Sequence, residues 1–519
     1  MCYDYGMDNI FRTIDRLTAY GVIKGLIPER ERVYSTNLIL DLLGLDSYDG
    51  VYEPFPETAD RLKSDPEGYL QSILRPLVDF AVKMGRVEDI IQLRDVFDTK
   101  LMNTLTPRPS AVIERFWKEF GESPEKATLN YYRFSKDTNY IRRDRIAKDE
   151  KWEGMTKYGR MEILVSLSKP ELDPKAIAAA GRAKATGFPR CALCRENEGY
   201  AGRVDFAARQ THRIIPLKLC GESFSLQYSP YRYCHQHCIV LNDTHIPMII
   251  NESALAKLLE FISLFPHYFL GSNADLPYVG GSVLSHEHFQ GGVHRLPVMD
   301  AKVRKTYKEG PGVEVSSLNW PLSTIRIRGK DRNVVLGYSS LYLRAWRDGY
   351  ENEALGIDPG TASDPHNTIT PLAYREAGDY VMLLMLRNNK RTENRPDGLF
   401  HTHPKHFHIK KEGIGIIDAP GLAILPPRLK KELASVKDVL SDKCLEKDHP
   451  EIEKHAAWME EIRVRHGNMA GKDVDAILRD EVVQVFARML EDCGVFGHTD
   501  KGFEAFDGFI MSVLQEAGF

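Results

Sequence analysis

The sequence has little of several features that mark specialised classes of protein. Cysteine is scarce, with 8 in 519 residues, far below the density of a disulfide-stabilised scaffold. No apolar run approaches the roughly 18 residues that a membrane-spanning helix needs, and the N-terminal segment lacks the basic and apolar stretches of a secretion signal. Neither sign of charge dominates, because 69 Lys and Arg face 73 Asp and Glu. These absences favour a cytoplasmic protein with no membrane and no nucleic-acid partner.

Three widespread catalytic motifs are also missing. The chain has no GxxxxGK[ST] phosphate loop, no GxGxxG after an expected strand and no GxSxG elbow. ATP hydrolysis by a phosphate loop, dinucleotide redox chemistry and α/β-hydrolase chemistry are therefore disfavoured.

What is present predicts an α+β protein of two to four domains. Hydrophobic residues make up 43% of the chain and charged residues 27%, as in ordinary globular proteins. Helical periodicity at both ends encloses two strand-rich stretches. This pattern predicts a helical region 1–160, a first sheet-containing half 161–310, a second half 311–426 and a helical tail 427–519.

Within these regions the pattern predicts particular elements. Helices are expected over 252–265 and 480–494, and strands over 280–292, 379–387 and 400–411. Two histidine-rich strands, one in each half, suggest that the sheet is duplicated.

The most informative segment is the glycine-bracketed strand GGSVLSHEHFQGG, 280–292. Period-two geometry puts His286, His288 and Gln290 on one face, with Glu287 opposite. The glycines ahead of them let a phosphate approach backbone N–H groups. Surface histidines on a hairpin are the alternative, but the glycine bracket and the glutamine favour a functional strand.

Cys191 and Cys194 form a Cys-x-x-Cys pair. Two thiolates at this spacing can hold one tetrahedral metal ion, but a structural zinc site needs four ligands. Reduced cysteines that bind no metal are the alternative. The histidines considered to complete the set are His235, His237, His245 and His286.

A tyrosine-rich stretch, 225–248, precedes the glycine bracket. Gln227, Tyr228 and Ser229 could line a pocket for a nucleotide base, or the tyrosines could pack in the core. The basic run 141–148 is either a solvated face or a phosphate contact.

A cluster of four histidines lies downstream and is also open to two interpretations. It could form a second metal or phosphate site, or only the polar face of a strand. Its members are His401, His403, His406 and His408.

At these motifs the chain resembles the galactose-1-phosphate uridylyltransferases of the second bacterial type, in the histidine-triad superfamily. The resemblance runs nearly end to end and implies a duplicated histidine-triad-like antiparallel sheet core between N-terminal and C-terminal helical regions. It is carried in order by GLIPERERVYSTNLILDLLGLDSYD, LTPRPSAVIERF, SKDTNYIRRDRIAKDEKW, CALCRENEGYAGR, QYSPYRYCHQHCIVLNDTHIPM, FLGSNADLPYVGGSVLSHEHFQGG and DGLFHTHPKHFHIKKEGIGIIDAPGLAILPPRLKKEL.

The resemblance implies roles on the active strand. Histidine-triad hydrolases carry three alternating histidines there, whereas the uridylyltransferases carry glutamine in the third place, where this chain has Gln290. By this match His288 is the nucleophile and Gln290 binds the nucleotide phosphate. The zinc ligands of the family, for a Zn2+ of structural role, fall on Cys191, Cys194, His245 and His286.

Further residues are expected to contact the nucleotide or its phosphates. They are Gln227, Tyr228, Ser229, Asn273, Gly281 and Ser282. Asp275 is the alternative to Asn273. Glu287 departs from the first type of the family, which has proline between the two histidines.

The activity implied is the exchange of UMP between UDP-glucose and galactose 1-phosphate, which gives glucose 1-phosphate and UDP-galactose through a uridylyl-histidine intermediate. The reaction belongs to galactose catabolism by the Leloir pathway. No organic cofactor is expected, and a homodimer is left open. The rivals are another histidine-triad nucleotide hydrolase or phosphorylase, and a zinc-stabilised binding protein that has lost activity.

Overall fold

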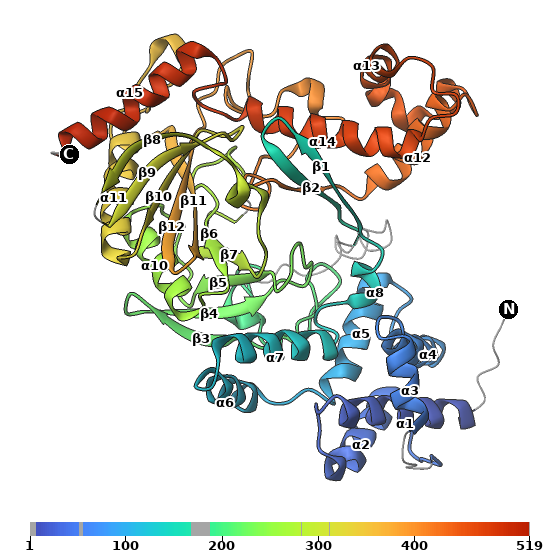
Figure 1. Cartoon of the computed structure of the whole chain (residues 1–519). Coiled ribbons are helices and arrows are strands. Elements are labelled where there is room, and N and C mark those ends of the chain that lie inside the picture. Colours follow the sequence, from blue (N-terminus) through green and yellow to red (C-terminus); the bar gives the residue numbers. More distant parts are fainter. Residues whose placement is uncertain (1–6, 51–55, 168–186, 282, 311, 518–519) are drawn as a thin grey trace. The chain divides into compact units, whose positions relative to one another are not determined.

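The computed structural model describes the chain except for residues 1–6, 51–55, 168–186, 282, 311 and 518–519 (Figure 1). The chain forms two compact units. Unit 1 comprises Met1–Lys148, Ser168–Leu217 and Ser223–Arg232, and unit 2 comprises Asp149–Leu167, Lys218–Glu222 and Tyr233–Phe519. In the described part of the chain, no helix is both long and apolar enough to cross a membrane.

Unit 1 consists mainly of helices. They are α1 (Met7–Ile23), α2 (Arg32–Leu43), α3 (Pro56–Ser64), α4 (Tyr69–Lys83), α5 (Ile91–Asn103), α6 (Pro109–Phe120), α7 (Pro124–Asp137) and α8 (Arg143–Ile146). In α4, Leu70, Ile73, Leu74 and Leu77 recur at helical spacing and are all buried. They join buried side chains of α1, α2 and α5 in one apolar core.

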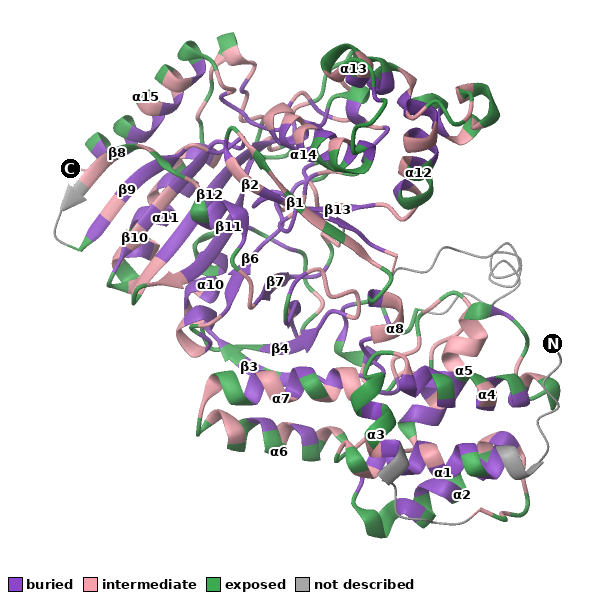
Figure 2. Ribbon diagram, turned by 45° about the vertical axis from the view of Figure 1, so that its right-hand side comes forward, coloured by how far each residue is buried: buried purple, intermediate pink, exposed green. Residues whose placement is uncertain are grey.

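Unit 2 is organised around an antiparallel sheet. In spatial order its strands are β5 (Cys238–Asn242), β7 (His288–Gly292), β6 (Phe269–Gly271), β11 (Asn367–Glu376), β12 (Asp379–Asn388), β10 (Thr324–Gly329), β9 (Val313–Leu318) and β8 (Val303–Gly310). Every neighbouring pair among them is antiparallel. Figure 2 shows that β11 and β12 are buried along most of their length. Two further strands, β3 (Ile215–Leu219) and β4 (Glu222–Tyr228), lie where the chain passes between the units.

The strand order of unit 2 reveals a duplication. In the first half β5, helix α10 (Glu252–Leu264), β6 and β7 follow one another, as β10, α11 (Arg332–Arg347), β11 and β12 do in the second. In each half the last strand lies between the first two. The halves join where β6 pairs with β11, with Gly271 opposite Leu372. The predicted α+β class, with a duplicated antiparallel sheet and helices at both ends, is confirmed.

Helix α10 confirms the helix expected over 252–265. The Asn251 side chain caps it by accepting a hydrogen bond from the N–H of Ala254. Leu255, Leu258 and Ile262 are fully buried on one face, and the helix packs against β6, β11 and α11. The apolar face of α10 therefore covers one face of the sheet.

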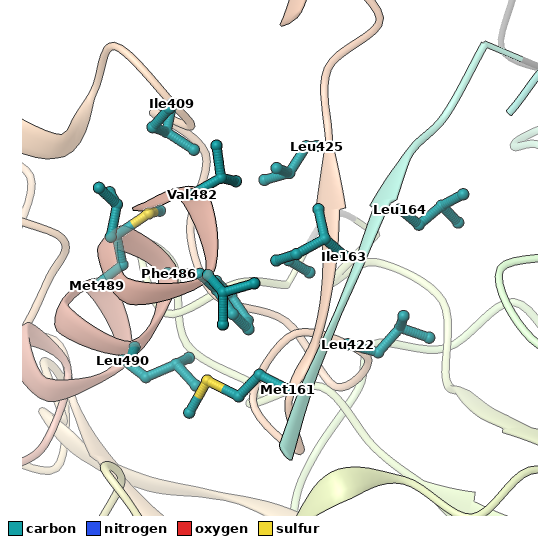
Figure 3. Close-up of a cluster of buried hydrophobic side chains, with 14 of the residues drawn as sticks. Met161, Ile163, Leu164, Ile409, Leu422, Leu425, Val482, Phe486, Met489 and Leu490 are labelled. Atoms are coloured by element: carbon teal, nitrogen blue, oxygen red, sulfur yellow. The ribbon is translucent and has the colours of Figure 1, made fainter. Parts of the chain in front are cut away.

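A second sheet joins the C-terminal helices. Its strands are β1 (Glu150–Thr156), β2 (Gly159–Val165) and β13 (Leu422–Leu425), and the helices are α12 (Arg428–Leu440), α13 (Ala456–His466), α14 (Val474–Asp492) and α15 (Asp500–Glu516). Figure 3 shows Ile163 of β2 and Leu425 of β13 on the side of the sheet where Val482 and Phe486 of α14 lie. These contacts hold the helical tail on unit 2.

Two predicted strands differ from the structure. The strand over 400–411 was wrong: the segment turns through a short 3-10 helix at Pro404–His406, where proline supplies no ladder N–H. Among the described residues of the segment 280–292, only His288–Gly292 form a strand, and Gly280, with a φ of +96°, lies outside the extended region. The strand over 379–387 is confirmed by β12, and the helix over 480–494 is the larger part of α14. The boundaries of the four predicted regions remain a prediction.

Candidate active site and metal ligands

His288 opens β7 and is fixed by a backbone carbonyl. The strand places it opposite Leu241, and Gln290 opposite Ile239. The imidazole is 3% exposed, and its Nδ1–H donates to the carbonyl oxygen of His286 at 2.7 Å. Because a carbonyl only accepts, this bond fixes the tautomer and leaves a lone pair on Nε2. Burial lowers the pKa of His288 to about 4, so the ring is neutral near pH 7.

The side chain of Gln290 is oriented by His237. His237 Nε2 lies 3.2 Å from Gln290 Oε1; an amide oxygen only accepts, so the imidazole carries a proton on Nε2 and the amide NH2 of Gln290 points elsewhere. The His237 ring stacks on Tyr233, with the centroids 5.0 Å apart. From the sequence, His237 is only one of the candidate metal ligands. His237 lies one residue before β5, which pairs with β7. This position could have indicated that His237 lies near Gln290.

Glu287, between the two histidines, is buried in a polar network. Its carboxylate accepts hydrogen bonds from Lys257 Nζ of α10 at 2.9 Å and from Asn242 Nδ2 at 2.7 Å. Lys257 is 4% exposed and also binds Glu222. The backbone of Asn242 donates to the carbonyl of Glu287 at 3.0 Å and accepts from His286 Nε2 at 2.8 Å. The residues just before β7 are therefore held on both sides.

The glycines around β7 allow other backbone segments to approach closely. A Cβ on Gly280 would lie 2.1 Å from the carbonyl oxygen of Ile414, and one on Gly291 would lie 2.3 Å from that of Phe269. Glycine is therefore required at both positions for packing alone. The predicted phosphate contact at Gly281 stays a prediction, and the one at Ser282 lies outside the described residues.

Asn273 and Asp275 differ in what their side chains already bind. Asn273 Oδ1 accepts from the N–H of Ile416 at 2.8 Å, which leaves its amide NH2 as a donor. Both oxygens of Asp275 are engaged: one accepts from Arg347 at 2.8 Å and the other from the hydroxyl of Thr368 at 2.5 Å. Asn273 is the better candidate for a nucleotide contact.

Side chains suited to zinc occur as two pairs, one in each unit. In unit 1, Cys191 Sγ and Cys194 Sγ lie 3.5 Å apart, in a turn where the Asn197 side chain donates to the carbonyls of both cysteines. That separation is far longer than a disulfide bond. It is close to the roughly 3.8 Å expected between two thiolates on one tetrahedral zinc.

The second pair is in unit 2. The rings of His245 and His286 have centroids 4.7 Å apart. Because His286 Nε2 donates to the carbonyl of Asn242, its Nδ1 keeps the lone pair that a metal needs. Each pair therefore offers two ligand atoms to a metal ion, and the binding of one ion by Cys191, Cys194, His245 and His286 together stays a prediction.

The expected base-pocket residues in unit 1 are largely buried. Gln227 Oε1 lies 2.9 Å from His212 Nε2, and the Tyr228 hydroxyl donates to a backbone carbonyl of α7 at 2.7 Å. Ser229 Oγ accepts from the N–H of Tyr231 at 3.3 Å. Their part in nucleotide binding stays a prediction.

Unit 1 also contains a cavity of about 220 Å³. The rings of Tyr140, Phe206 and Tyr231 line it together with Arg203 and Arg209. Aromatic faces beside guanidinium groups suit a planar ring that carries negative charge. Phe206 and Arg209 belong to no recognisable motif and could not be identified from the sequence.

The basic run 141–148 contributes to the wall of the same cavity. Arg142 pairs with Asp98 at 3.0 Å and Arg145 pairs with Asp95 at 2.6 Å. These arginines are partly buried in ion pairs, so the solvated-face interpretation does not describe them.

With this geometry in place, comparison with known proteins gives the class. Two family models match the chain: galactose-1-phosphate uridyl transferase, N-terminal domain, over residues 25–247, and C-terminal domain, over residues 261–458. Relatives named galactose-1-phosphate uridylyltransferase are 44% identical over 500 residues in Clostridium acetobutylicum, covering 96% of this chain and 98% of the relative. The relative from Halalkalibacterium halodurans is 44% identical over 513 residues, covering 97% of this chain and 98% of the relative. The relative from Bacillus subtilis is 41% identical over 510 residues, covering 97% of each chain. Among solved structures, the yeast Ap4A phosphorylase is 12% identical, with a TM-score of 0.34 over 64% of this chain and 92% of that one.

The protein is an enzyme of the nucleotidyltransferase class. It belongs to the galactose-1-phosphate uridylyltransferase family. Cys191, Cys194 and His245 lie in the segment matched by the N-terminal model, and His288 and Gln290 in that matched by the C-terminal model.

Proposed function

We propose that this enzyme exchanges UMP between UDP-glucose and galactose 1-phosphate, giving glucose 1-phosphate and UDP-galactose, as a step of the Leloir pathway in the cytoplasm. The family and the names of its relatives support these substrates. The observation that carries the proposal is the state of His288: a buried, neutral imidazole whose Nδ1–H is bound to a carbonyl and whose Nε2 holds a lone pair.

The chemistry is a double displacement at one phosphorus. His288 Nε2 attacks the α-phosphorus of UDP-glucose, an N–P bond forms, the bond to the bridging oxygen breaks, and glucose 1-phosphate leaves with that electron pair. An oxygen of galactose 1-phosphate then attacks the same phosphorus, and the N–P bond breaks to regenerate the Nε2 lone pair. The proton on Nδ1 stays in place throughout. Its bond to the carbonyl of His286 stabilises the positive charge of the uridylylated ring.

Gln290 binds the phosphoryl oxygens in this scheme. His237 holds Oε1, so the NH2 group donates to a non-bridging oxygen, and the N–H of Gly281 is proposed as a second donor. An amide takes no proton from water and provides no general base. Glutamine in the third place therefore favours transfer to a sugar phosphate over hydrolysis, which argues against the hydrolase rival.

We propose that the cavity of unit 1 can bind a nucleotide ring. Tyr231 and Phe206 offer faces for a ring, and Arg209 offers charge for a diphosphate. The remaining residues proposed to shape or contact the nucleotide are Gln227, Tyr228, Ser229 and Asn273.

We also propose that one Zn2+ is bound by Cys191, Cys194, His245 and His286. The donor set fits a closed site of two sulfur and two nitrogen ligands. The Sγ–Sγ separation of the cysteines and the anchored ring of His286 support it. When bound, the ion supplies rigidity rather than a catalytic step.

Two assays test the function. Mixing UDP-glucose with galactose 1-phosphate is expected to give UDP-galactose. Labelled glucose 1-phosphate is expected to exchange into UDP-glucose with no galactose 1-phosphate present, because the first displacement needs only one sugar. Absence of exchange while the full reaction runs would defeat the covalent scheme, and tighter binding of ADP-glucose than of UDP-glucose would favour the adenosine-specific rivals.

A further inference from the structure

The four clustered histidines do not form one site, and two of them line a separate cavity in unit 2. His406 and His408 contribute to its wall, together with parts of α13 and α14, and its volume is about 540 Å³, within the usual range for small-ligand pockets. We propose that this cavity is a second ligand site, which binds the phosphate group of a small phosphorylated compound. It uses none of the residues assigned above to UMP transfer.

The charges at the cavity favour an anion. Lys405, Lys454 and Arg488 line it against one carboxylate, that of Glu461. Lys454 is paired with Glu432 at 2.5 Å, and Glu461 is paired with an arginine of its own helix. Within the described chain, the side chains of Arg488 and Lys405 make no ion pair or hydrogen bond. A partly buried guanidinium without a partner is unfavourable until an anion meets it, and its planar fork suits phosphate oxygens.

A buried series of hydrogen bonds leaves His408 as a hydrogen-bond acceptor in the wall of the same cavity. His455 Nε2 donates to Glu432 Oε2 at 3.0 Å, and His455 Nδ1 lies 2.8 Å from His408 Nδ1. Because the carboxylate only accepts, His455 carries its proton on Nε2 and accepts at Nδ1 from His408. His408 Nε2 is left with a lone pair that can accept from a hydroxyl group of a ligand.

Trp458 contributes its ring to the cavity. The residue is 4% exposed, it lines the cavity, and its Nε1–H has no acceptor among the described residues. Buried donors are normally paired, but this N–H is itself closed to solvent, so the contact that Trp458 offers a ligand is with its ring. The ring also packs against His408, with the centroids 5.2 Å apart.

The wall beside the histidines is anchored before any ligand arrives. One carboxylate oxygen of Asp492, on α14, accepts from the backbone N–H of His403 at 2.8 Å and from His406 Nδ1 at 2.9 Å. Little ordering is therefore needed on binding. Cations for a phosphate, an acceptor for a hydroxyl and the apolar ring of Trp458 together describe a sugar phosphate; inorganic phosphate satisfies only the first of them.

Trp458 also reports on the site. The full-length protein is titrated with glucose 1-phosphate, inorganic phosphate and glucose while tryptophan fluorescence is recorded. We expect a saturable change with glucose 1-phosphate, a weaker affinity for inorganic phosphate and no change with glucose, and loss of the signal in Trp458→Phe. Arg488→Gln is expected to weaken binding tenfold or more, and Lys405→Gln to weaken it less.

The matched control is Arg479→Gln, an exposed arginine of the same helix that does not line the cavity, which is expected to bind as the wild type does. An equal response in Arg488→Gln, a response to glucose as strong as that to glucose 1-phosphate, or no response at all would overturn the proposal. Lys405 is exposed, so Lys405→Gln keeps the test valid if Arg488→Gln does not fold. UMP transfer is measured in the same variants. Binding at this cavity and UMP transfer are separate results, so the failure of one does not decide the other.

Discussion

The Lys257 ammonium lies 2.9 Å from the Glu287 carboxylate, and both side chains are buried. Glu287 separates His286, a proposed metal ligand, from His288, the proposed nucleophile. One ion pair therefore fixes the segment on which both proposed functions depend.

Replacing Lys257 with methionine is expected to destabilise the fold. It leaves the Glu287 carboxylate buried without its cation, and breaking a buried pair costs roughly 3–5 kcal/mol. Urea unfolding measures the loss. Lys257→Met combined with Glu287→Gln should be less destabilised than Lys257→Met alone, because no buried charge remains.

The control for that experiment is a surface pair. Lys437, at the surface, pairs with Asp475, so Lys437→Met should change the free energy of unfolding by about 1 kcal/mol at most. A Lys257→Met protein as stable as the control would show that the buried pair does not hold the segment.

His288→Asn is expected to lower turnover about a thousandfold or more, since removal of a covalent nucleophile forces another path. UDP-glucose should still bind, and the melting temperature should stay close to that of the wild type. In the wild type quenched after UDP-glucose alone, mass spectrometry should find an acid-labile, base-stable uridylyl adduct on the peptide containing 286–292. An adduct on the 401–408 histidines would move the reaction centre there.

His237 is expected to act as a positioning residue. His237→Phe removes the hydrogen bond that orients Gln290 and should reduce kcat about tenfold or more, with a smaller change in KM. His237→Gln can still donate to Gln290 Oε1 and should recover part of the activity. Equal losses of kcat in the two variants would point to a purely structural role.

Metal analysis is expected to find about one zinc per chain. Cys191→Ser should lose the metal and lower both the melting temperature and activity, whereas Cys444→Ser, which changes a cysteine outside the proposed site, should alter neither. A zinc-free protein with full activity and stability would exclude the site.

Acid should weaken the attachment of α15. Burial opposes ionisation of Asp507, but hydrogen bonds from Arg304, Lys305 and Tyr307 outweigh it and lower the pKa of Asp507 to about 2. A carboxyl with a lowered folded-state pKa stabilises the fold above its unfolded pKa of about 3.9 and loses this effect as the pH falls toward 2. Asp507→Asn should therefore be less stable than the wild type at pH 7, with the difference shrinking between pH 4 and pH 2; a constant difference would contradict this assignment.

The contiguous motifs were the part of the site that the sequence could predict. His288 and Gln290 stand two residues apart on one strand, so their pairing is visible without a fold. Lys257 and His237 could not be found in this way, because their partners lie 30 and 53 residues away along the chain.

The fold was predictable where periodicity dominates, as in α10 and β12. The prediction was wrong at 400–411. The alternating histidines there are typical of a strand, but Pro404 begins a turn. The duplication showed itself in the order of strands rather than in a sequence repeat, because the two halves preserve connectivity and not side chains.

The difference between the two halves bears on how many uridylyl groups each chain can accept. Strand β12 occupies in the second half the place that β7 has in the first, yet its sequence, DYVMLLMLRN, contains neither histidine nor glutamine. Its middle residues are aliphatic or methionine and fully buried, so this copy has become interior structure. In the proposed double displacement His288 is then the one acceptor for a uridylyl group, and saturating label is expected to level off at one equivalent per chain, however many chains associate.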